Sequence, residues 1–355
     1  MKALVLSGGK GTRLRPLTHT IAKQLVPVAG VPILGYVLGH IASAAIVDVG
    51  IIISPETGNE VKEYVQDGGH WNINVTYILQ ENPLGLAHAV LMAREFIGED
   101  DFIMYLGDNL LSSGLKNALS RFLNDRPEAL IFLKEVENPQ NFGVARLDRE
   151  GNIVELIEKP LNPPSKLALV GVYMFTAKIF DAIRQIKPSR RGELEITDAI
   201  DWLIKNGYTV QSEQIGGWWL DTGKKDDLLE ANTIVLDEYV KQDIRGFVDD
   251  NSSIMGRVEI AAGTHVKAST IRGPVRIGEN SLISNAFIGP YTSIGSNVRI
   301  VNSVIEHSVI LNDSTIEGIE RLEDSLLGRY TTVIHNAQKH KALRLMISDN
   351  SVVEV

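Results

Sequence analysis

The residues best suited to chemistry lie near the amino terminus, in a glycine-rich segment that carries two basic side chains. The segment Ser7-Gly8-Gly9-Lys10-Gly11-Thr12-Arg13 follows the apolar run 3–6, which has the length and branching of a buried strand. Glycines let the backbone turn sharply and present N–H groups to a ligand, and Lys10 and Arg13 add positive charge. Such a turn suits a polyphosphate. The spacing fits neither the Walker pattern nor the dinucleotide fingerprint, so an ordinary strand–helix turn remains the alternative.

Two aspartates each come directly after an apolar run and close to a glycine. Asp108 follows the run Phe102–Leu106, and Asp221 follows Trp218-Trp219-Leu220. Magnesium binds through one or two carboxylates and completes its shell with water and substrate phosphates. If both side chains point into one cleft, they can share a magnesium ion; otherwise they are turn or helix-capping residues. Lys23 would add a cation for a triphosphate, although a lone lysine is usually a solvated surface charge.

Two further segments pair polar side chains with turn residues. Glu158-Lys159-Pro160 could bind a sugar hydroxyl and a phosphate, or could be a surface charge pair of little energetic value. The segment 80–87 places Gln80, whose amide can pair with a nucleobase edge, before Gly85, which lets a base lie against the backbone. A plain helix-entry turn is the alternative there. His88 and His307 have no recognisable partners in the sequence, so we expect structural roles for both.

The first two-thirds of the chain alternates strand-like and helix-like segments. Short apolar runs occupy 49–53, 75–78 and 102–106, and helical patterns occupy 33–45, 60–66 and 87–96. This alternation predicts an α/β layer fold with a mixed, mostly parallel sheet, in which ligands bind beyond the carboxyl ends of strands.

The pattern changes after residue 250, where aliphatic residues recur at every sixth position. They form three runs: Ile254, Ile260 and Val266; then Ile277 and Ile283; then Ile288, Ile294 and Ile300. A six-residue period indicates a hexapeptide β-helix, with an irregular β-sandwich as the less favoured reading. We expect residues 270–274 to bulge from the coils, residues 236–244 to connect the domains, and the basic segment 336–346 to cap the open end. The predicted domains are 1–240, 250–335 and a tail, 336–355.

Composition narrows the class of protein. Of the 355 residues, 44% are hydrophobic and 22% are charged, which is typical of a globular protein. The net charge of −9 argues against binding to nucleic acid or to an anionic membrane. The absence of cysteine excludes disulfides, thiolate metal sites and a cysteine nucleophile. With no signal-peptide pattern and no membrane-spanning run, we expect a cytoplasmic protein.

Taken together in their order along the chain, the motifs described above resemble those of the sugar-1-phosphate nucleotidylyltransferases, and specifically of the long form that ends in hexapeptide repeats. Residues 9–18 with Lys23 match the family's G-x-G-T-R-L-x-P-x-T loop and its downstream lysine. Residues 80–87 look like its nucleobase turn, 106–109 and 219–223 like its two magnesium segments, and 158–160 like its sugar-phosphate motif. The segment 191–198 is also typical. The likeness covers essentially all of residues 1–240.

The resemblance implies a Rossmann-like nucleotidyltransferase domain followed by a left-handed parallel β-helix. It implies Mg²⁺-dependent transfer of a nucleotidyl group from dTTP to glucose 1-phosphate, giving dTDP-glucose and pyrophosphate by direct in-line displacement. The residues it designates are, for catalysis, Arg13, Lys23 and Lys159; for the nucleotide, Gly8, Gly9, Gly11, Thr12, Arg13, Gln80, Gly85 and Asp108; for the sugar phosphate, Gly143, Glu158, Lys159, Gly171 and Tyr173; and for the metal, Asp108 and Asp221.

Several alternatives stay open. UTP could replace dTTP, because one methyl group distinguishes the two bases, and another sugar phosphate could replace glucose 1-phosphate. The short enzymes usually have tyrosine where this chain has Phe142, which removes one hydroxyl from the sugar site. Other readings are a non-catalytic regulatory protein and a β-helix acyltransferase with an inert α/β domain. Flat aliphatic faces on the β-helix would favour a homo-oligomer.

Overall fold

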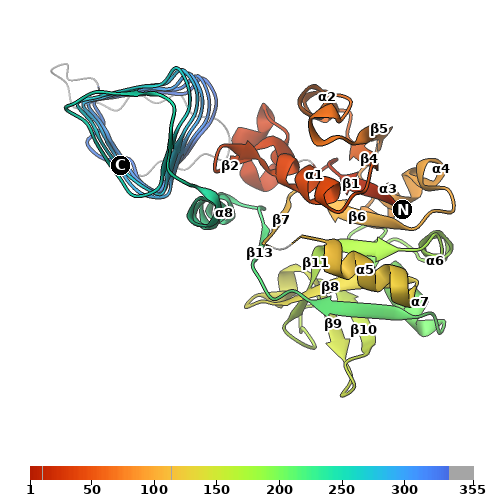
Figure 1. Cartoon of the computed structure of the whole chain (residues 1–355). Helices are drawn as coiled ribbons and strands as arrows, with labels where there is room; N and C mark the ends of the chain where they lie inside the picture. Colours follow the sequence, from red (N-terminus) through yellow and green to blue (C-terminus); the bar gives the residue numbers. More distant parts are fainter. Residues whose placement is uncertain (10, 113, 336–355) are drawn as a thin grey trace. The chain divides into compact units, whose positions relative to one another are not determined.

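The computed structural model describes residues 1–9, 11–112 and 114–335 (Figure 1). Its contacts divide the chain into two compact units, and the first part of the chain alternates between them. The first unit comprises Met1–Lys10, Ile21–Leu25 and Ile33–Asp221, and the second comprises Gly11–Thr20, Val26–Pro32 and Thr222–Val355.

A nine-stranded mixed sheet forms the centre of the first unit. The order β10-β9-β11-β6-β1-β4-β5 gives its main path, and β8 joins β11 to β12. The half β6-β1-β4-β5 is parallel, as the sequence predicts, whereas β11 runs antiparallel to β6, β8 and β9. The strands are β1 (Lys2–Leu6), β4 (Asp48–Ile53), β5 (Asn74–Leu79), β6 (Phe102–Leu106), β8 (Ala129–Glu135), β9 (Gly143–Leu147), β10 (Ile153–Glu158), β11 (Leu167–Phe175) and β12 (Val210–Gln214), with β7 (Asn109–Leu111) and β13 (Trp219–Asp221) as a separate pair.

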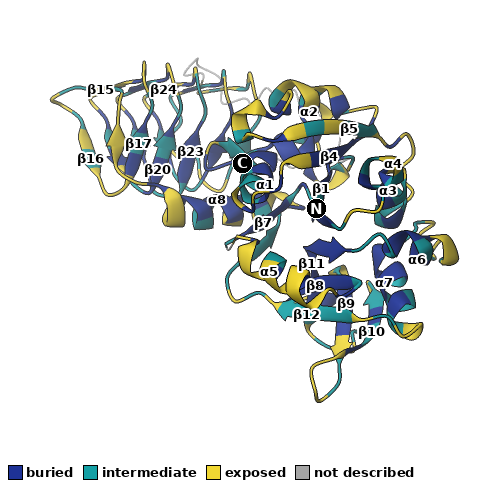
Figure 2. Ribbon diagram, turned by 45° about the vertical axis from the view of Figure 1, so that its right-hand side comes forward, coloured by how far each residue is buried: buried dark blue, intermediate teal, exposed yellow. Residues whose placement is uncertain are grey.

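Helices cover this sheet, and its strands β1, β4, β6, β8 and β11 are largely buried (Figure 2). The helices are α1 (Ile33–Ser43), α2 (Gly58–Val65), α3 (Leu86–Met92), α4 (Arg94–Ile97), α5 (Lys116–Asp125), α6 (Ile179–Gln185) and α7 (Ile196–Lys205). The predicted helix 87–96 is interrupted at Ala93, which is fully buried and separates α3 from α4. Apolar residues of α3, α4, α6 and α7 share one core with the sheet. This core fixes where each strand ends.

The second unit contains a parallel β-helix whose three sheets form a triangular tube (Figure 1). The first sheet is β14 (Asp243–Ile244), β17 (Val258–Ile260), β20 (Val275–Ile277), β23 (Thr292–Ile294), β26 (Val309–Ile310) and β28 (Leu326–Leu327). The second is β15 (Phe247–Val248), β18 (His265–Lys267), β21 (Leu282–Ser284), β24 (Arg299–Val301), β27 (Thr315–Glu317) and β29 (Thr332–Ile334). The third is β16 (Ser253–Met255), β19 (Thr270–Arg272), β22 (Phe287–Ile288) and β25 (Val304–Ile305).

The expected bulge at residues 270–274 is wrong. Thr270–Arg272 is strand β19, which pairs with β16 and β22, and Ile271 is fully buried inside the tube. Ile271 follows Val266 by five positions rather than six, because one side of the coil is shorter than the others. The strict six-residue period therefore loses the register there, although Ile254 and Ile271 pair one coil apart.

The repeated aliphatic residues lie inside the tube rather than on its outer faces. Ile260, Val266, Ile277, Ile283 and their counterparts form one buried cluster. In the described part of the second unit, the large hydrophobic residues left exposed are Tyr239, Ile244, Phe247, Met255, Tyr330 and Ile334. In this described part, the aliphatic residues of the six-residue repeat therefore fill the interior of the tube and do not form the flat outer faces expected from the sequence.

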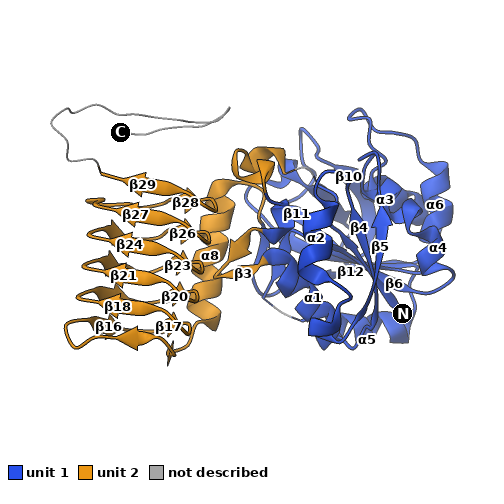
Figure 3. Ribbon diagram, turned by 90° about the horizontal axis from the view of Figure 1, so that it is seen from above, with its two compact units in different colours: residues 1–10, 21–25, 33–221 blue, residues 11–20, 26–32, 222–355 orange. Residues whose placement is uncertain are grey.

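Helix α8 (Lys225–Tyr239) and the hairpin of β2 (Pro27–Val28) and β3 (Val31–Pro32) also belong to the second unit (Figure 3). Asn232 of α8 is 1% exposed and joins both to the β-helix. Its Oδ1 accepts a hydrogen bond from Ala29 N–H at 2.9 Å, and its Nδ2 donates to Tyr291 O at 2.9 Å. Arg276 of β20 donates from Nη1 to Ala29 O at 2.9 Å. The tip of the hairpin is thus held by two side chains from distant parts of the sequence.

The connection between α8 and the β-helix is shorter than predicted, because α8 ends at Tyr239 and β14 begins at Asp243. The predicted cap at 336–346 and the tail 336–355 lie outside the described residues, as does Lys10. Within the described ranges, no helix is long and apolar enough to cross a membrane.

We predict that Asn232→Ala lowers the thermal unfolding midpoint, because it leaves the buried N–H of Ala29 and the half-buried carbonyl of Tyr291 without their side-chain partner, at a cost of about 1–3 kcal/mol. The control is Glu230→Ala, which changes an exposed residue of the same helix. Equal midpoints for the two variants, measured by circular dichroism on the full chain, would contradict the role given to Asn232.

Candidate active site

Lys23 joins the two aspartates that the sequence singles out. Its Nζ lies 2.5 Å from Asp108 Oδ2 and 3.9 Å from Asp221 Oδ1, and the lysine side chain is only 7% exposed. Asp108 follows β6, and Asp221 ends β13, which pairs antiparallel with β7 so that Asp221 faces Asn109. This pairing brings the two carboxylates to one ammonium group, as expected if both point into one cleft.

The environment of Asp108 favours its ionised form. Burial alone would raise the pKa of Asp108, but the charge of Lys23 and hydrogen bonds from Lys23 and Asn109 outweigh burial and hold this pKa below its usual value. Asp108 therefore stays a carboxylate across the physiological range. Such an oxygen donor suits a hard divalent cation.

Asn109 links this charge cluster to two other strands, a role that the sequence analysis missed. The side chain is 2% exposed. Its Nδ2 donates to Asp108 Oδ1 at 2.9 Å, while its Oδ1 accepts from Gly171 N–H at 3.2 Å and from Trp219 Nε1 at 2.6 Å. A Cβ on Gly171 would lie only 2.5 Å from that oxygen, so glycine is required there. The position next to Asp108 was the only signal for Asn109 in the sequence.

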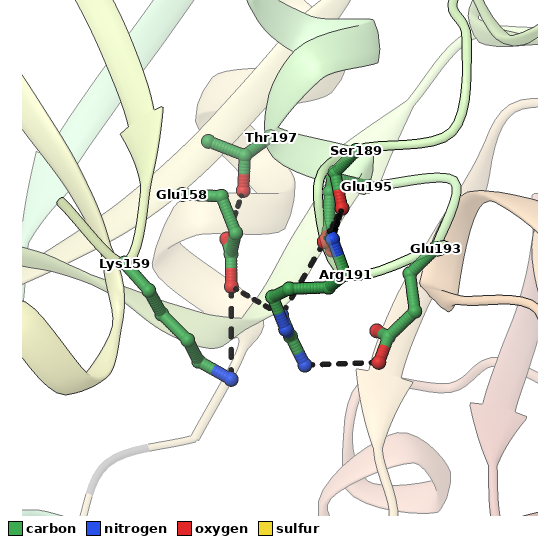
Figure 4. Close-up of polar contacts among 7 residues, drawn as sticks. All are labelled: Glu158, Lys159, Ser189, Arg191, Glu193, Glu195 and Thr197. Carbon is green, nitrogen blue, oxygen red and sulfur yellow. Dashed lines mark hydrogen bonds and ion pairs between the residues drawn. The ribbon is translucent and has the colours of Figure 1, made fainter.

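A second cluster surrounds Glu158 at the end of β10 (Figure 4). Thr197 donates from its hydroxyl to Glu158 Oε2 at 2.6 Å. Lys159 Nζ lies 3.9 Å from Glu158 Oε1, and Arg191 Nη1 lies 3.5 Å from the same oxygen. Arg191 also contacts Glu193 at 2.9 Å and Glu195 at 3.3 Å. Arg191 and Thr197 lie in the segment 191–198, which the sequence analysis noted without assigning roles to these residues.

Of the other residues predicted for the sugar phosphate, Gly143 and Tyr173 lie near Glu158, whereas Gly171 contacts Asn109. Gly143 pairs with Glu158 across β9 and β10, and a Cβ on Gly143 would come within 3.1 Å of Glu158 Oε2. Burial raises the pKa of the Tyr173 hydroxyl, and the nearby charge of Glu158 adds to that shift. Phe142 packs edge-on against Trp219 with ring centroids 5.1 Å apart. Phe142 and Trp219, together with Asn109 and Gly171, thus connect the Glu158 cluster to the Asp108 cluster within the first unit.

Glu158 differs electrostatically from Asp108. Burial raises its pKa, and the neighbouring Glu195 adds to the rise, while the Thr197 hydrogen bond and the charges of Lys159 and Arg191 oppose it. The net direction is upward. Glu158 therefore takes up a proton at a higher pH than an ordinary glutamate does.

Three of the residues predicted to bind the nucleotide, Gly8, Gly9 and Gln80, lie in the first unit near the carboxyl ends of β1 and β5. A Cβ on Gly8 would lie 3.5 Å from Gln80 Oε1, and one on Gly9 would lie 3.6 Å from Gln24 Nε2. Gln24 is 2% exposed, and its Oε1 has no hydrogen-bond partner among the described residues. The sequence analysis gave Gln24 no role, although it follows Lys23 directly.

Gly85 has a structural reason to be glycine. Its φ is +109°, and a Cβ would lie 2.4 Å from Leu194 O. Leu194 N–H donates to Leu84 O at 2.7 Å, and Ala87 N–H donates to Leu194 O at 3.0 Å. The turn carrying Gly85 is therefore fixed against the segment that precedes α7.

Gly11, Thr12 and Arg13 belong to the second unit, so their predicted roles stay predictions. Thr12–Leu14 forms a short 3₁₀ helix after Gly11, whose φ is +60°, and Thr18 donates to Gly11 O at 2.7 Å. A Cβ on Gly223 would lie 3.1 Å from Arg13 Nη2, so the guanidinium group packs against this glycine.

Comparison with known proteins decides the family. A profile described as nucleotidyl transferase matches residues 2–238, and one described as the GlmU-like C-terminal hexapeptide matches residues 239–353. The chain belongs to the nucleotidyl transferase family. The family resemblance inferred from the motifs is therefore confirmed.

Relatives match this nucleotidyltransferase from end to end. The glucose-1-phosphate thymidylyltransferase of Streptomyces antibioticus is 50% identical over 356 residues, covering 100% of this chain and 99% of the relative. That of Streptomyces griseus is 46% identical over 355 residues, covering 100% and 99%. The crystal structure of a UDP-glucose pyrophosphorylase with UDP-glucose superposes with a TM-score of 0.62 at 26% identity, covering 67% of this chain and 98% of the other.

We predict that Gly85→Ala destabilises this nucleotidyltransferase more than Gly151→Ala. Both positions have positive φ, but a Cβ on Gly151 would meet nothing within 4 Å, so that variant bears only the backbone cost of about 1–2 kcal/mol. The added contact with Leu194 should lower the thermal midpoint of Gly85→Ala further. Identical midpoints would show that the turn moves away from Leu194 without cost.

Proposed function

We propose that the protein transfers a thymidylyl group from dTTP to glucose 1-phosphate, releasing pyrophosphate. The observation that carries the proposal is the convergence of Asp108 and Asp221 on the ammonium group of Lys23. The two carboxylates outnumber the single ammonium group, so the cluster fits a triphosphate that binds together with a divalent cation. The full-length thymidylyltransferase relatives support the choice of substrates.

The reaction needs no protein nucleophile, because a phosphate oxygen of glucose 1-phosphate is already anionic and can attack the α-phosphorus in line. The protein then contributes positioning and charge neutralisation. In this proposal Gly8, Gly9, Gly11, Thr12 and Arg13 hold the β- and γ-phosphates, which leave together as pyrophosphate. Lys23 neutralises charge that develops around the α-phosphate.

Lys159 and Arg191 neutralise the phosphate of the sugar, which reduces its repulsion from the triphosphate. Glu158 accepts hydrogen bonds from sugar hydroxyl groups, and Gly143, Gly171 and Tyr173 shape the space around the ring. Gln80 and Gly85 contact the pyrimidine.

The residues present also fit Mg²⁺. The described residues contain no group of three or more acidic, histidine or cysteine ligands, but magnesium often takes only one or two carboxylates besides water and phosphates. Asp108 and Asp221, which both face the ammonium group of Lys23, would hold the magnesium ion. When bound, the ion would offset negative charge on the nucleotide phosphates.

UTP is the second candidate nucleotide, and the likeness to a structure that contains UDP-glucose favours it. Thymine and uracil differ by one methyl group, which is worth about 1 kcal/mol in an apolar pocket. A cytoplasmic location and assembly into a homo-oligomer also remain part of the proposal; light scattering tests the assembly.

The proposed function is tested by measuring pyrophosphate release with dTTP, UTP, dCTP, GTP and ATP, each with glucose 1-phosphate and with other sugar phosphates. We expect the highest kcat/KM for dTTP with glucose 1-phosphate. No release with any pair would overturn the proposal. Release of free thiol from acetyl-CoA with a sugar phosphate would instead support an acyltransferase.

Asp108→Asn keeps the shape of the side chain but removes its charge, so we predict that turnover falls by about a hundredfold or more, as for loss of one preorganised charge. Asp226→Asn, which alters an exposed aspartate of α8, is the control. Both variants should fold, as judged by circular dichroism. A near-normal rate for Asp108→Asn would remove Asp108 from the proposed machinery.

The raised pKa of Glu158 predicts a pH-dependent KM for the sugar phosphate. As the pH falls through that pKa, the carboxylate gains a proton and no longer accepts hydrogen bonds from two hydroxyl groups. KM should therefore begin to rise at a pH above the range in which an ordinary glutamate titrates. Glu158→Gln should have a higher KM throughout and lack this rise. The substrate's own titration is common to both proteins, so an identical acid limb would refute the assignment.

A further inference from the structure

Arg191 occupies a central position of a tight turn that is closed by its own backbone. The N–H of Gly192 donates to the carbonyl oxygen of Ser189 at 2.9 Å, and the N–H of Ser189 donates to the carbonyl oxygen of Glu193 at 2.8 Å. The Ser189 hydroxyl oxygen accepts from the N–H of Arg191 at 3.1 Å, and the hydroxyl donates to Glu195 Oε1 at 2.8 Å. The bonds that hold this turn therefore use the backbone and Ser189, and none of them uses the side chain of Glu193.

Three carboxylates surround the guanidinium group of Arg191 (Figure 4). Nη2 lies 2.9 Å from Glu193 Oε1, whereas Nη1 lies 3.3 Å from Glu195 Oε1 and 3.5 Å from Glu158 Oε1. The side chains of Glu195 and Glu158 are 4% and 19% exposed, but that of Glu193 is 34% exposed. Glu193 is thus the nearest of the three carboxylates, and it is also the one that can most readily turn away into water.

The nitrogen that Glu193 occupies is the one that a phosphate needs. A guanidinium group binds a phosphate most strongly through two parallel N–H groups of one edge. The edges that offer such a pair are Nη1–Nη2 and Nε–Nη2, so Nη2 belongs to both. A phosphate that binds either edge of Arg191 therefore places its oxygens beside the Glu193 carboxylate, and the two negative groups repel each other.

We propose that Glu193 is a resident counter-ion of Arg191 that the phosphate of the sugar phosphate must displace, so that Glu193 weakens the binding of this substrate. The inference rests on the proposed function for the contact between Arg191 and the phosphate. It extends that function by adding a residue that sets substrate affinity, to which the mechanism above gives no part. Because the turn does not depend on the Glu193 side chain, removal of its charge leaves Arg191 in place.

The test measures equilibrium binding of glucose 1-phosphate to the full chain by calorimetry, at low ionic strength and without nucleotide. Glu193→Gln removes the charge and keeps the size of the side chain, and we expect its Kd to be about threefold lower than that of wild type, as for loss of one exposed ion pair. Glu95→Gln, which changes an exposed glutamate of α4, is the matched control and should bind like wild type.

A second pair of variants tests whether the effect passes through Arg191. Arg191→Gln should bind glucose 1-phosphate more weakly than wild type. Adding Glu193→Gln to that variant should then give little or no gain in affinity, because no guanidinium group is left for the carboxylate and the phosphate to share. Circular dichroism checks that all variants fold.

Unchanged or weaker binding in Glu193→Gln would overturn the inference, because the carboxylate would then hold Arg191 ready for the phosphate. An equal gain in Glu95→Gln would also overturn it, by showing an effect of net charge alone, and so would an equal gain on the Arg191→Gln background. Absence of binding by wild type would likewise reject it. No turnover is needed here, so failure of the proposed reaction would be seen separately, in the pyrophosphate assay.

Discussion

The first unit depends on one electrostatic arrangement, in which a nearly buried ammonium group is shared between two carboxylates. Lys23 lies against Asp108 and within 4.0 Å of Asp221, and its side chain is 7% exposed. Two carboxylates brought together without a cation would repel, and one would take up a proton. The lysine keeps Asp108 ionised, so its carboxylate suits a divalent cation that binds together with a triphosphate. The β7–β13 pairing is what holds this arrangement in place.

The two clusters of the first unit shift the pKa of their central carboxyl groups in opposite directions. Asp108 gains a cation and an amide donor, and its pKa falls. Glu158 receives one short hydrogen bond from Thr197, while its basic neighbours lie farther away and Arg191 is shared with Glu193 and Glu195, so its pKa rises. The first environment suits a permanent charge beside phosphates. The second suits a carboxyl group that binds neutral hydroxyl groups and senses pH.

The second unit relies on apolar burial in the tube and on a few polar side chains outside it. The aliphatic residues of the repeat fill the interior, where parallel strands one coil apart stack like on like, as Ile260 does with Ile277. Asn232 and Arg276 then satisfy the backbone of the 26–32 hairpin. These contacts give the hairpin its conformation, since a two-residue strand pair has little stability of its own.

The sequence by itself determined the kinds of elements and the chemical types of the site residues. Apolar runs of strand length gave β1, β4, β5 and β6, and aliphatic periodicity gave the β-helix, because both patterns follow from local burial. The sequence patterns did not reveal that the helix 87–96 is interrupted at Ala93 or that Ile271 follows Val266 by five positions, because tertiary packing overrides an ideal period at such points. The family motifs supplied Asp108, Asp221, Lys23, Glu158 and Lys159, but they gave no role to Asn109, Arg191 or Thr197.

Only the tertiary structure decided which of these groups meet. Asp221 reaches Lys23 through the register of two short strands, Asn109 joins three segments far apart in sequence, and the carbonyl oxygen of Gly85 faces the nitrogen of the Gln80 amide. Each of these outcomes depends on long-range backbone pairing or on a choice between a donor and an acceptor atom of one side chain. Residue types and spacing do not reveal the strand register or the choice between donor and acceptor atom, because both depend on neighbours that only folding brings together.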